Sequence, residues 1–193
     1  MNKTNFKIYV FLLMSICSLG AWAQKDYASW VDPFIGSGGH GHVFVGASVP
    51  FGAVQLGPNN VFKGWDWCSG YHYSDNVIVG FSHNHLSGTG CNDLGDVALM
   101  PYTGELRTRV ADKDNLKGAT SSTYKHENEK CAPGYYAVNL DNGVNVELTA
   151  TERVGLHHYT FNTKGERRVL IDLVNGIGNK TYESYVKKID DYT

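Results

Sequence analysis

Large apolar residues occupy every second position through much of the chain's second half, which is the period of a β-strand. Residues 136–140 and 144–148 show this alternation, and the step Asp141-Asn142-Gly143 between them is typical of a tight hairpin turn. Shorter runs of the same kind predict further strands at Val77–Phe81, Val97–Met100, Glu105–Val110, Gly155–Phe161 and Val169–Val174. Gly, Pro, Asp and Asn separate these runs, and no long segment keeps a helical period. The pattern therefore predicts an all-β domain, a β-sandwich with few helices.

Two of the predicted strands contain continuous apolar runs, at residues 77–79 and 169–171. Runs without polar interruption are typical of strands that are covered on both faces. We therefore expect both strands to lie inside the sandwich.

The start of the chain has the pattern of a secretory signal peptide. Basic residues precede an apolar stretch, ending at Cys17, that is too short to span a bilayer, and Ala21-Trp22-Ala23 offers a cleavage site. A lipoprotein signal ending at Cys17 is the weaker alternative, because Ile16 stands where a small residue is expected. We expect residues 1–23 to be removed and residues 24–193 to form one exported domain, periplasmic or secreted, without an integral membrane segment.

The composition excludes several classes of function. The chain has 193 residues with 17 Lys+Arg, 19 Asp+Glu, a net charge of −2 and only 19% charged residues. This low and nearly balanced charge content excludes a disordered polyelectrolyte. It also provides no positive electrostatic field that would attract nucleic acid. Beyond the leader stand Cys68, Cys91 and Cys131, an odd number whose spacings fit no zinc pattern and no disulfide scaffold. The sequence leaves undecided whether two of these cysteines form a disulfide bridge.

The segment from Trp30 to Asp96 is crowded with Gly, His, Trp and Tyr, and much of it is expected to form loops. Five histidines fall within it: His40, His42, His72, His83 and His85. In an extended conformation His83 and His85 project from the same face, as a metal-binding pair would, with Asp93 and Asp96 close behind. The spacing matches no zinc motif, so hydrogen-bonded loop anchors are the favoured reading over a His-dependent metallohydrolase.

Other common sites lack support in this segment. The run at residues 36–39 is not followed by the Gly-Lys-Ser/Thr of a phosphate-binding loop, and no Gly-x-Ser-x-Gly elbow occurs. Trp65-Asp66-Trp67-Cys68, followed by Tyr71-His72-Tyr73, is more informative. Flat aromatic faces stack on sugar C–H groups, and Asp or His side chains hydrogen-bond the hydroxyls. The segment indicates a sugar-binding wall, with buried core tryptophans as the alternative.

Several ordered motifs make the chain resemble a known family. They are Val31-Asp32-Pro33-Phe34-Ile35-Gly36, Gly39-His40-Gly41-His42, Val49-Pro50-Phe51-Gly52, Val54-Gln55-Leu56, Gly64 through Tyr73, Gly80-Phe81-Ser82-His83, His85 through Cys91 and Asp93-Leu94-Gly95-Asp96. Together they resemble the amino-terminal region of glycoside hydrolase family 92, the exo-acting α-mannosidases. The likeness is dense up to about Pro101 and looser beyond it.

The resemblance implies a two-domain exported enzyme. A β-sandwich of the supersandwich type precedes an (α/α)6 barrel, and between them a calcium ion engages mannose hydroxyls while two carboxylates perform an inverting hydrolysis. The chain stops at Thr193 without the barrel, so we expect a truncated product that lacks its C-terminal catalytic domain. The acid, the base and most calcium ligands are then expected outside it, and the isolated chain is expected to be inactive.

By the same resemblance, the chain's own contribution is a wall facing a mannose-containing glycan. Its expected substrate-binding residues are Trp67 and Cys68, followed by Asp66, Trp65, His83 and His85. A second hypothesis stays open, in which the chain is a stand-alone carbohydrate-binding or interaction module without catalysis.

Overall fold

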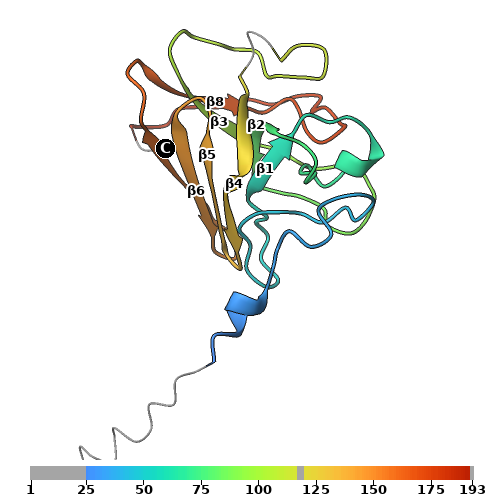
Figure 1. Ribbon diagram of the computed structural model, residues 1–193. Helices are drawn as coiled ribbons and strands as arrows, with labels where there is room; N and C mark the ends of the chain where they lie inside the picture. Colours follow the sequence, from blue (N-terminus) through green and yellow to red (C-terminus); the bar gives the residue numbers. More distant parts are fainter. Residues whose placement is uncertain (1–24, 117–119, 192–193) are drawn as a thin grey trace, which may run out of the picture. The chain divides into compact units, whose positions relative to one another are not determined.

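The computed structural model describes residues 25–116 and 120–191, which contain eight β-strands, two short 3₁₀ helices and no α-helix (Figure 1). The elements are η1 (Tyr27–Trp30), β1 (Gly57–Asn60), η2 (Trp65–Trp67), β2 (Val77–Ser82), β3 (Ala98–Thr103), β4 (Ser122–Ala132), β5 (Tyr135–Leu140), β6 (Val144–Ala150), β7 (Gly155–Phe161) and β8 (Arg167–Asp172). The predicted leader, residues 1–23, lies outside the described residues. Helix η1 belongs to a separate unit that ends at Trp30, in which the rings of Tyr27 and Trp30 meet edge to face at 5.4 Å.

The predicted hairpin is confirmed as β5 and β6. Val138 pairs with Val146 across the two strands. The turn between them is held by the side chain of Asn142, whose Oδ1 accepts a hydrogen bond from the backbone N–H of Val144 at 3.0 Å. Gly143 has φ +84, and a Cβ there would lie 2.3 Å from Cγ2 of Thr163, so this turn requires glycine on both grounds.

All strand pairings between the named strands are antiparallel, in the order β7-β6-β5-β4-β2-β3-β8, with β1 paired to β2. Strand β4 joins the two halves of this order, and Figure 1 shows it between β5 and β2. Ser122 and Thr123 pair with β2, whereas Tyr124 and residues 129–132 pair with β5, with an irregular register between Tyr124 and Glu129. This change of partner lets the strands enclose a common core.

The core forms where the inward faces of β5 and β6 meet those of β2, β3 and the loop around residues 45–56. Its buried members from the strands include Ile78, Phe81, Met100, Tyr136, Val138, Leu140, Val144, Val146 and Leu148. Along β6 buried residues alternate with more accessible ones, as the period-two pattern predicts. The all-β, sandwich-like fold expected from the sequence is confirmed.

The structure corrects two strand predictions and adds two strands that were not predicted. Residues 105–110 form an exposed loop, in which Val110 makes only an isolated bridge to Thr120. The continuous apolar run in β8 is covered on one face only, because Val169 and Ile171 are exposed. Strands β1 and β4 were not predicted; β4 carries several charged residues on its exposed positions, so its apolar signal is weak. Among the described residues, no helix is long and apolar enough to cross a membrane.

Candidate functional site

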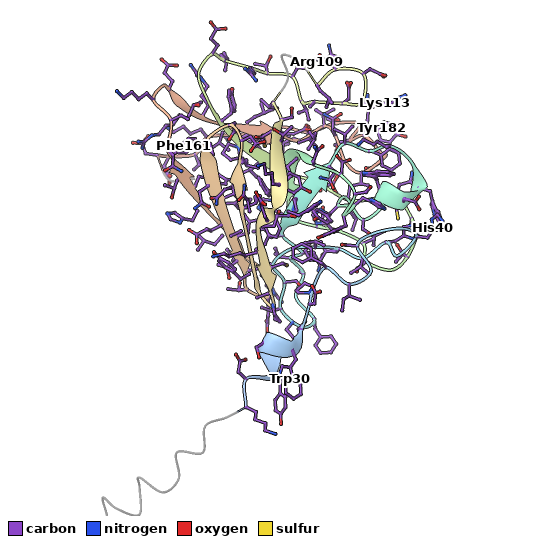
Figure 2. The ribbon with its side chains drawn as sticks, viewed as in Figure 1. Trp30, His40, Arg109, Lys113, Phe161 and Tyr182 are labelled. Carbon is purple, nitrogen blue, oxygen red and sulfur yellow. The ribbon has the colours of Figure 1, made fainter. Side chains whose placement is uncertain are left out.

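A cluster of aromatic and ionisable side chains lies at the surface beside η2. It consists of His40, His42, Trp65 and Asp66, and we call it the surface cluster. Figure 2 shows His40 at the outer edge of the molecule, next to the short η2 helix. The two histidines come from the glycine-rich loop at residues 36–42, whereas Trp65 and Asp66 belong to η2. The fold thus joins two of the segments that the sequence singled out.

The indole of Trp65 is fixed by neighbouring groups, including the ring of His40 at 5.6 Å between centroids, and stays partly exposed. Its Nε1–H donates to the backbone carbonyl of Gly90 at 2.8 Å, and the ring of His42 packs against it edge to face at 4.2 Å between centroids. The residue nevertheless remains 56% exposed. A fixed and accessible indole of this kind is suited to stacking on a ligand.

The carboxylate of Asp66 stands between the two histidines. Its Oδ1 lies 2.6 Å from Nδ1 of His40 and 3.6 Å from Nε2 of His42. The hydrogen bond with His40 lowers the pKa of Asp66 below its usual 3.8, so this group is ionised at neutral pH. Among the described residues, Nε2 of His42 is buried without a hydrogen-bond partner. The cluster therefore offers an anionic acceptor beside a partly exposed indole.

Trp67, although only two residues further on, faces a different environment. Its ring stacks on His72 at 4.5 Å, and its Nε1–H donates to Oδ2 of Asp75 at 3.0 Å. The Lys63 ammonium binds the same carboxylate oxygen at 2.6 Å and lies 5.4 Å from the Trp67 ring. Trp67 also lines a cavity of about 430 Å³, bounded by β1 and by residues 172–180 among others. Trp67 is therefore a half-buried residue that lines this cavity, and it does not offer an exposed ring at the surface.

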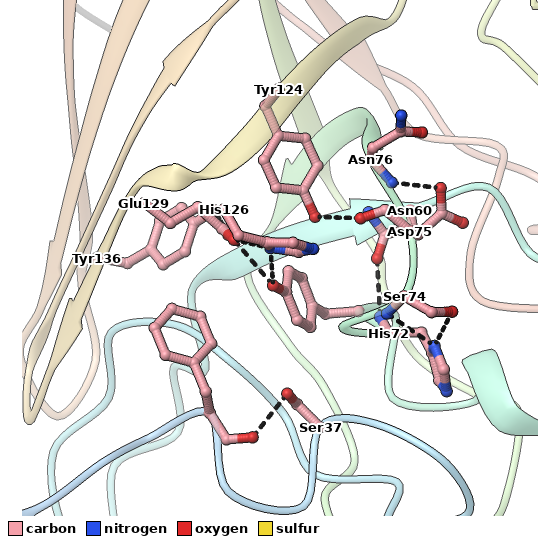
Figure 3. Close-up of polar contacts among 12 residues, drawn as sticks. Ser37, Asn60, His72, Ser74, Asp75, Asn76, Tyr124, His126, Glu129 and Tyr136 are labelled. Carbon is pink, nitrogen blue, oxygen red and sulfur yellow. Dashed lines mark hydrogen bonds and ion pairs between the residues drawn. The ribbon is translucent and has the colours of Figure 1, made fainter.

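A network of polar contacts holds the loop that follows Trp67 (Figure 3). The backbone N–H of His72 donates to Oδ1 of Asn60 at 2.7 Å, and Nδ1 of the same ring lies 2.8 Å from the Ser74 hydroxyl. Tyr124 on β4 donates its hydroxyl to the Asp75 carbonyl at 3.0 Å. These bonds attach the irregular loop to the sheet, so that η2 is carried on a fixed support.

A buried carboxylate lies close to this network. Glu129 accepts hydrogen bonds from the hydroxyls of Tyr71 and Tyr136 at 2.9 and 2.6 Å, and Nδ1 of His126 lies 2.6 Å from it. Burial and the neighbouring carboxylate both raise the pKa of Tyr71 and of Tyr136, so these tyrosines remain protonated donors. With its oxygens engaged from three sides, Glu129 is a structural residue of the core.

The other three predicted site residues do not join the surface cluster. Cys68 is 1% exposed and His85 is 4% exposed. The His85 ring lies between the Gln55 carbonyl at 2.8 Å from Nδ1 and the Asn59 Oδ1 at 2.7 Å from Nε2, and burial lowers its pKa to about 4. His83 is half-buried and does not pair with His85, because its ring turns toward His157 on β7.

The acidic residues after His85 accept hydrogen bonds from nearby groups of the loop at residues 84–96. Oδ1 of Asp93 accepts from the backbone N–H of Leu94 at 2.8 Å, and Oδ2 of Asp96 accepts from the Asn84 amide at 3.1 Å. Within the described ranges, no three His, Cys, Asp or Glu side chains gather as a metal site. These residues by themselves do not fit the oxygen-rich shell that calcium prefers.

Residues His40 and His42 were noted in the sequence for their glycine-rich surroundings but not as partners of Asp66. His40 and Asp66 are 26 positions apart in the chain, so no local sequence pattern predicts their contact. The sequence indicated only that many glycines surround the two histidines, which is typical of a loop whose backbone adopts conformations closed to other residues.

Comparison with known proteins agrees with this architecture. A sequence model of the "Glycosyl hydrolase family 92 N-terminal domain" matches residues 30–193. A family GH92 α-mannosidase from Bacteroides thetaiotaomicron, solved with mannoimidazole, is 37% identical, with a TM-score of 0.74 over 78% of this chain and 20% of that one. A family GH92 inverting mannosidase from the same organism is 27% identical, with a TM-score of 0.64 over 77% of this chain and 20% of its own.

A curated relative from Arthroderma benhamiae, described as an uncharacterized secreted glycosidase, is 29% identical over 76% of this chain and 19% of its own length. The chain thus spans about a fifth of the length of the relatives it matches. The match of the family's amino-terminal domain over residues 30–193, together with the shared fold, shows that this chain belongs to glycoside hydrolase family 92.

Proposed function

We propose that this chain is the substrate-binding, amino-terminal part of an exported, calcium-dependent, inverting exo-α-mannosidase of the α-1,2-mannosidase type that acts on mannose-containing glycans. Membership of the family and the mannosidases among its structural relatives support this proposal. The general acid, the general base and most calcium ligands are assigned to the part of the relatives that this chain does not span. Export agrees with the leader pattern in residues 1–23 and with the secreted relative.

The observation that carries the proposal is the open indole of Trp65 beside the ionised carboxylate of Asp66. The indole face is suited to the C–H groups of a pyranose ring, and the carboxylate accepts hydrogen bonds from its hydroxyls. The buried Nε2 atom of His42 lies 3.6 Å from Oδ1 of Asp66 and helps to position that carboxylate. Such a combination selects a sugar, because a polar group left unmatched on binding costs affinity.

The electrostatics of Asp66 define what this side chain does in the reaction. Inverting hydrolysis needs one carboxylic acid that protonates the leaving oxygen and one carboxylate that activates water. A group whose pKa lies below 3.8 is deprotonated at neutral pH and does not serve as that acid. Asp66 therefore orients the terminal sugar by accepting hydrogen bonds from its hydroxyls.

The remaining predicted residues support this wall from behind. Trp67 and its bond to Asp75 fix the end of η2, and Cys68 and His85 are buried in the interior. The terminal mannose is expected against Trp65 and Asp66, while Trp67 forms the inner side of the wall.

The experiment is a chimera in which residues 30–193 replace the matching segment of the 37% identical mannosidase. We expect release of mannose from an α-1,2-mannobioside. In this chimera Trp65→Ala should lower kcat/KM by about 30-fold, the effect of losing a well-packed tryptophan contact. Trp30→Ala, which also removes an exposed indole, serves as the matched control and should leave kcat/KM within about twofold.

Two results would contradict the proposal. An active chimera in which Trp65→Ala and Trp30→Ala behave alike would remove Trp65 from the substrate wall. A chimera that folds but stays inactive, together with mannoside binding by the 193-residue chain alone, would favour the stand-alone carbohydrate-binding module. The chain alone is expected to release no mannose.

A further inference from the structure

Two imidazoles meet on the side of the sandwich where β2 ends and β7 passes. His83 directly follows β2, and His157 is the third residue of β7. These strands are not neighbours in the sheet, since β6, β5 and β4 separate them in the strand order. The Nε2 atoms of the two rings lie 3.1 Å apart, and both residues are half-buried. The pair is thus a side-chain link between two parts of the sheet.

Each ring is oriented by an oxygen atom behind it. Nδ1 of His83 lies 2.7 Å from the carbonyl oxygen of Val97, and Nδ1 of His157 lies 2.6 Å from the hydroxyl of Tyr159. His157 and Tyr159 are two residues apart on the same face of β7. Because each Nδ1 atom contacts an oxygen atom, the two Nε2 atoms are turned toward each other. Histidines that bind metals are oriented in this way by an oxygen on the opposite ring nitrogen.

We propose that His83 and His157 form a binding site for a divalent transition-metal ion such as Zn²⁺ or Cu²⁺, with water completing the coordination. Two nitrogens bound to zinc at about 2.05 Å in tetrahedral geometry lie about 3.3 Å apart, close to the observed separation. Imidazole nitrogen is a preferred ligand of these ions, whereas calcium prefers oxygen. The site is therefore separate from the calcium of the proposed function, and neither proposal depends on the other.

The surroundings of the pair also suit a metal. No third His, Cys, Asp or Glu in the described part of the chain joins the pair, which leaves positions for water. A bound ion would link the end of β2 to β7 and so stabilise the folded protein.

The test uses untagged, metal-stripped protein of residues 24–193, first with Cu²⁺ and then with Zn²⁺. With one equivalent of Cu²⁺ we expect an electron paramagnetic resonance spectrum with hyperfine structure from two imidazole nitrogens. Saturating Zn²⁺ should raise Tm by about 5 °C. Both effects should disappear in His83→Gln and in His157→Gln. His158→Gln, which alters the adjacent exposed residue of β7, is the matched control and should retain both.

Tyr159→Phe provides a variant that keeps both ligands. Loss of the hydroxyl behind His157 should weaken Cu²⁺ binding by about tenfold while the spectrum still shows two nitrogens. The proposal is overturned if the wild-type protein binds no stoichiometric Cu²⁺, because the two rings then share only an N–H···N hydrogen bond. It is equally overturned if His83→Gln and His157→Gln bind Cu²⁺ as the wild type does, since the metal then lies elsewhere.

Discussion

The indole N–H of Trp65 donates to the carbonyl oxygen of Gly90 at 2.8 Å, and this bond determines where the indole lies. Gly90 has φ +67, and a Cβ added there would approach Nε1 of Trp65 to 3.2 Å. Gly88, two residues earlier, has a similar φ of +72 but nothing within 4 Å of an added Cβ. Substitutions at these two positions therefore distinguish the effect of backbone strain from the effect of contact with the indole.

The first prediction compares these glycines in the mannosidase chimera. Gly90→Ala should lower kcat/KM by about tenfold, because displacing Trp65 misaligns the sugar. Gly88→Ala carries the same left-handed strain, about 1 kcal/mol of stability, but should leave kcat/KM nearly unchanged. Kinetics on an α-1,2-mannobioside and thermal unfolding measure the two effects. Equal losses of activity in both variants would show that strain, not the position of Trp65, is responsible.

The second prediction concerns the ionisation of Asp66. Since His40 holds the pKa of this carboxyl below 3.8, the stabilisation it provides is present above pH 3.8 and is lost as pH falls through the folded-state pKa. Carboxyl ¹³C NMR should give a midpoint below 3.8 for Asp66. His40→Gln should move that midpoint upward, whereas His126→Gln, in the separate Glu129 cluster, should not. An unchanged midpoint in His40→Gln would contradict the assignment of His40 as the main cause.

The third prediction concerns the core between the strand layers. Leu148 on β6 is 1% exposed within the apolar cluster, so Leu148→Ala should reduce the free energy of unfolding by about 2–5 kcal/mol. Leu156 on β7 is 60% exposed, and Leu156→Ala should change it by no more than about 0.5 kcal/mol. Denaturant unfolding monitored by circular dichroism measures both. Similar losses in the two variants would mean that the face of β7 bearing Leu156 is covered in solution.

The fourth prediction concerns the thiols. Burial raises the pKa of Cys68 and raises that of Cys131 to about 11, whereas Cys91 is exposed. Iodoacetamide at about pH 8 should therefore modify Cys91 in the folded protein and reach the other two only after denaturation. Peptide mass spectrometry identifies the modified sites. Rapid modification of Cys131 under native conditions would contradict its partial burial and its contact with the carbonyl of Gly46.

The strands were largely predictable because burial of one face leaves a period-two pattern in the chain. The predicted strand at residues 155–161 agrees with β7, and the hairpin turn at Asn142 lies where the sequence indicates. The failures have physical causes. Strand β4 is rich in charged residues on its open face, so it resembles a loop, and residues 105–110 have a strand-like composition without a partner strand.

The candidate site was predictable by segment but not by arrangement. The sequence singled out η2 and both histidine-bearing loops, yet it did not separate exposed Trp65 from half-buried Trp67 or from buried Cys68. Trp65, Trp67 and Cys68 lie in one tight turn, and their side chains point in different directions. The burial of each side chain depends on which distant segments of the chain pack around the turn.

From the sequence alone, the all-β class and the likeness to glycoside hydrolase family 92 could be recognised, because strand period and ordered motifs are properties of neighbouring residues. Only the tertiary structure decided that Asp66 meets His40 across 26 positions and that His83 meets His157 across 74. Such contacts depend on the path of the loops and on the pairing of distant strands. A period along the chain carries no information about which remote side chains that path brings together.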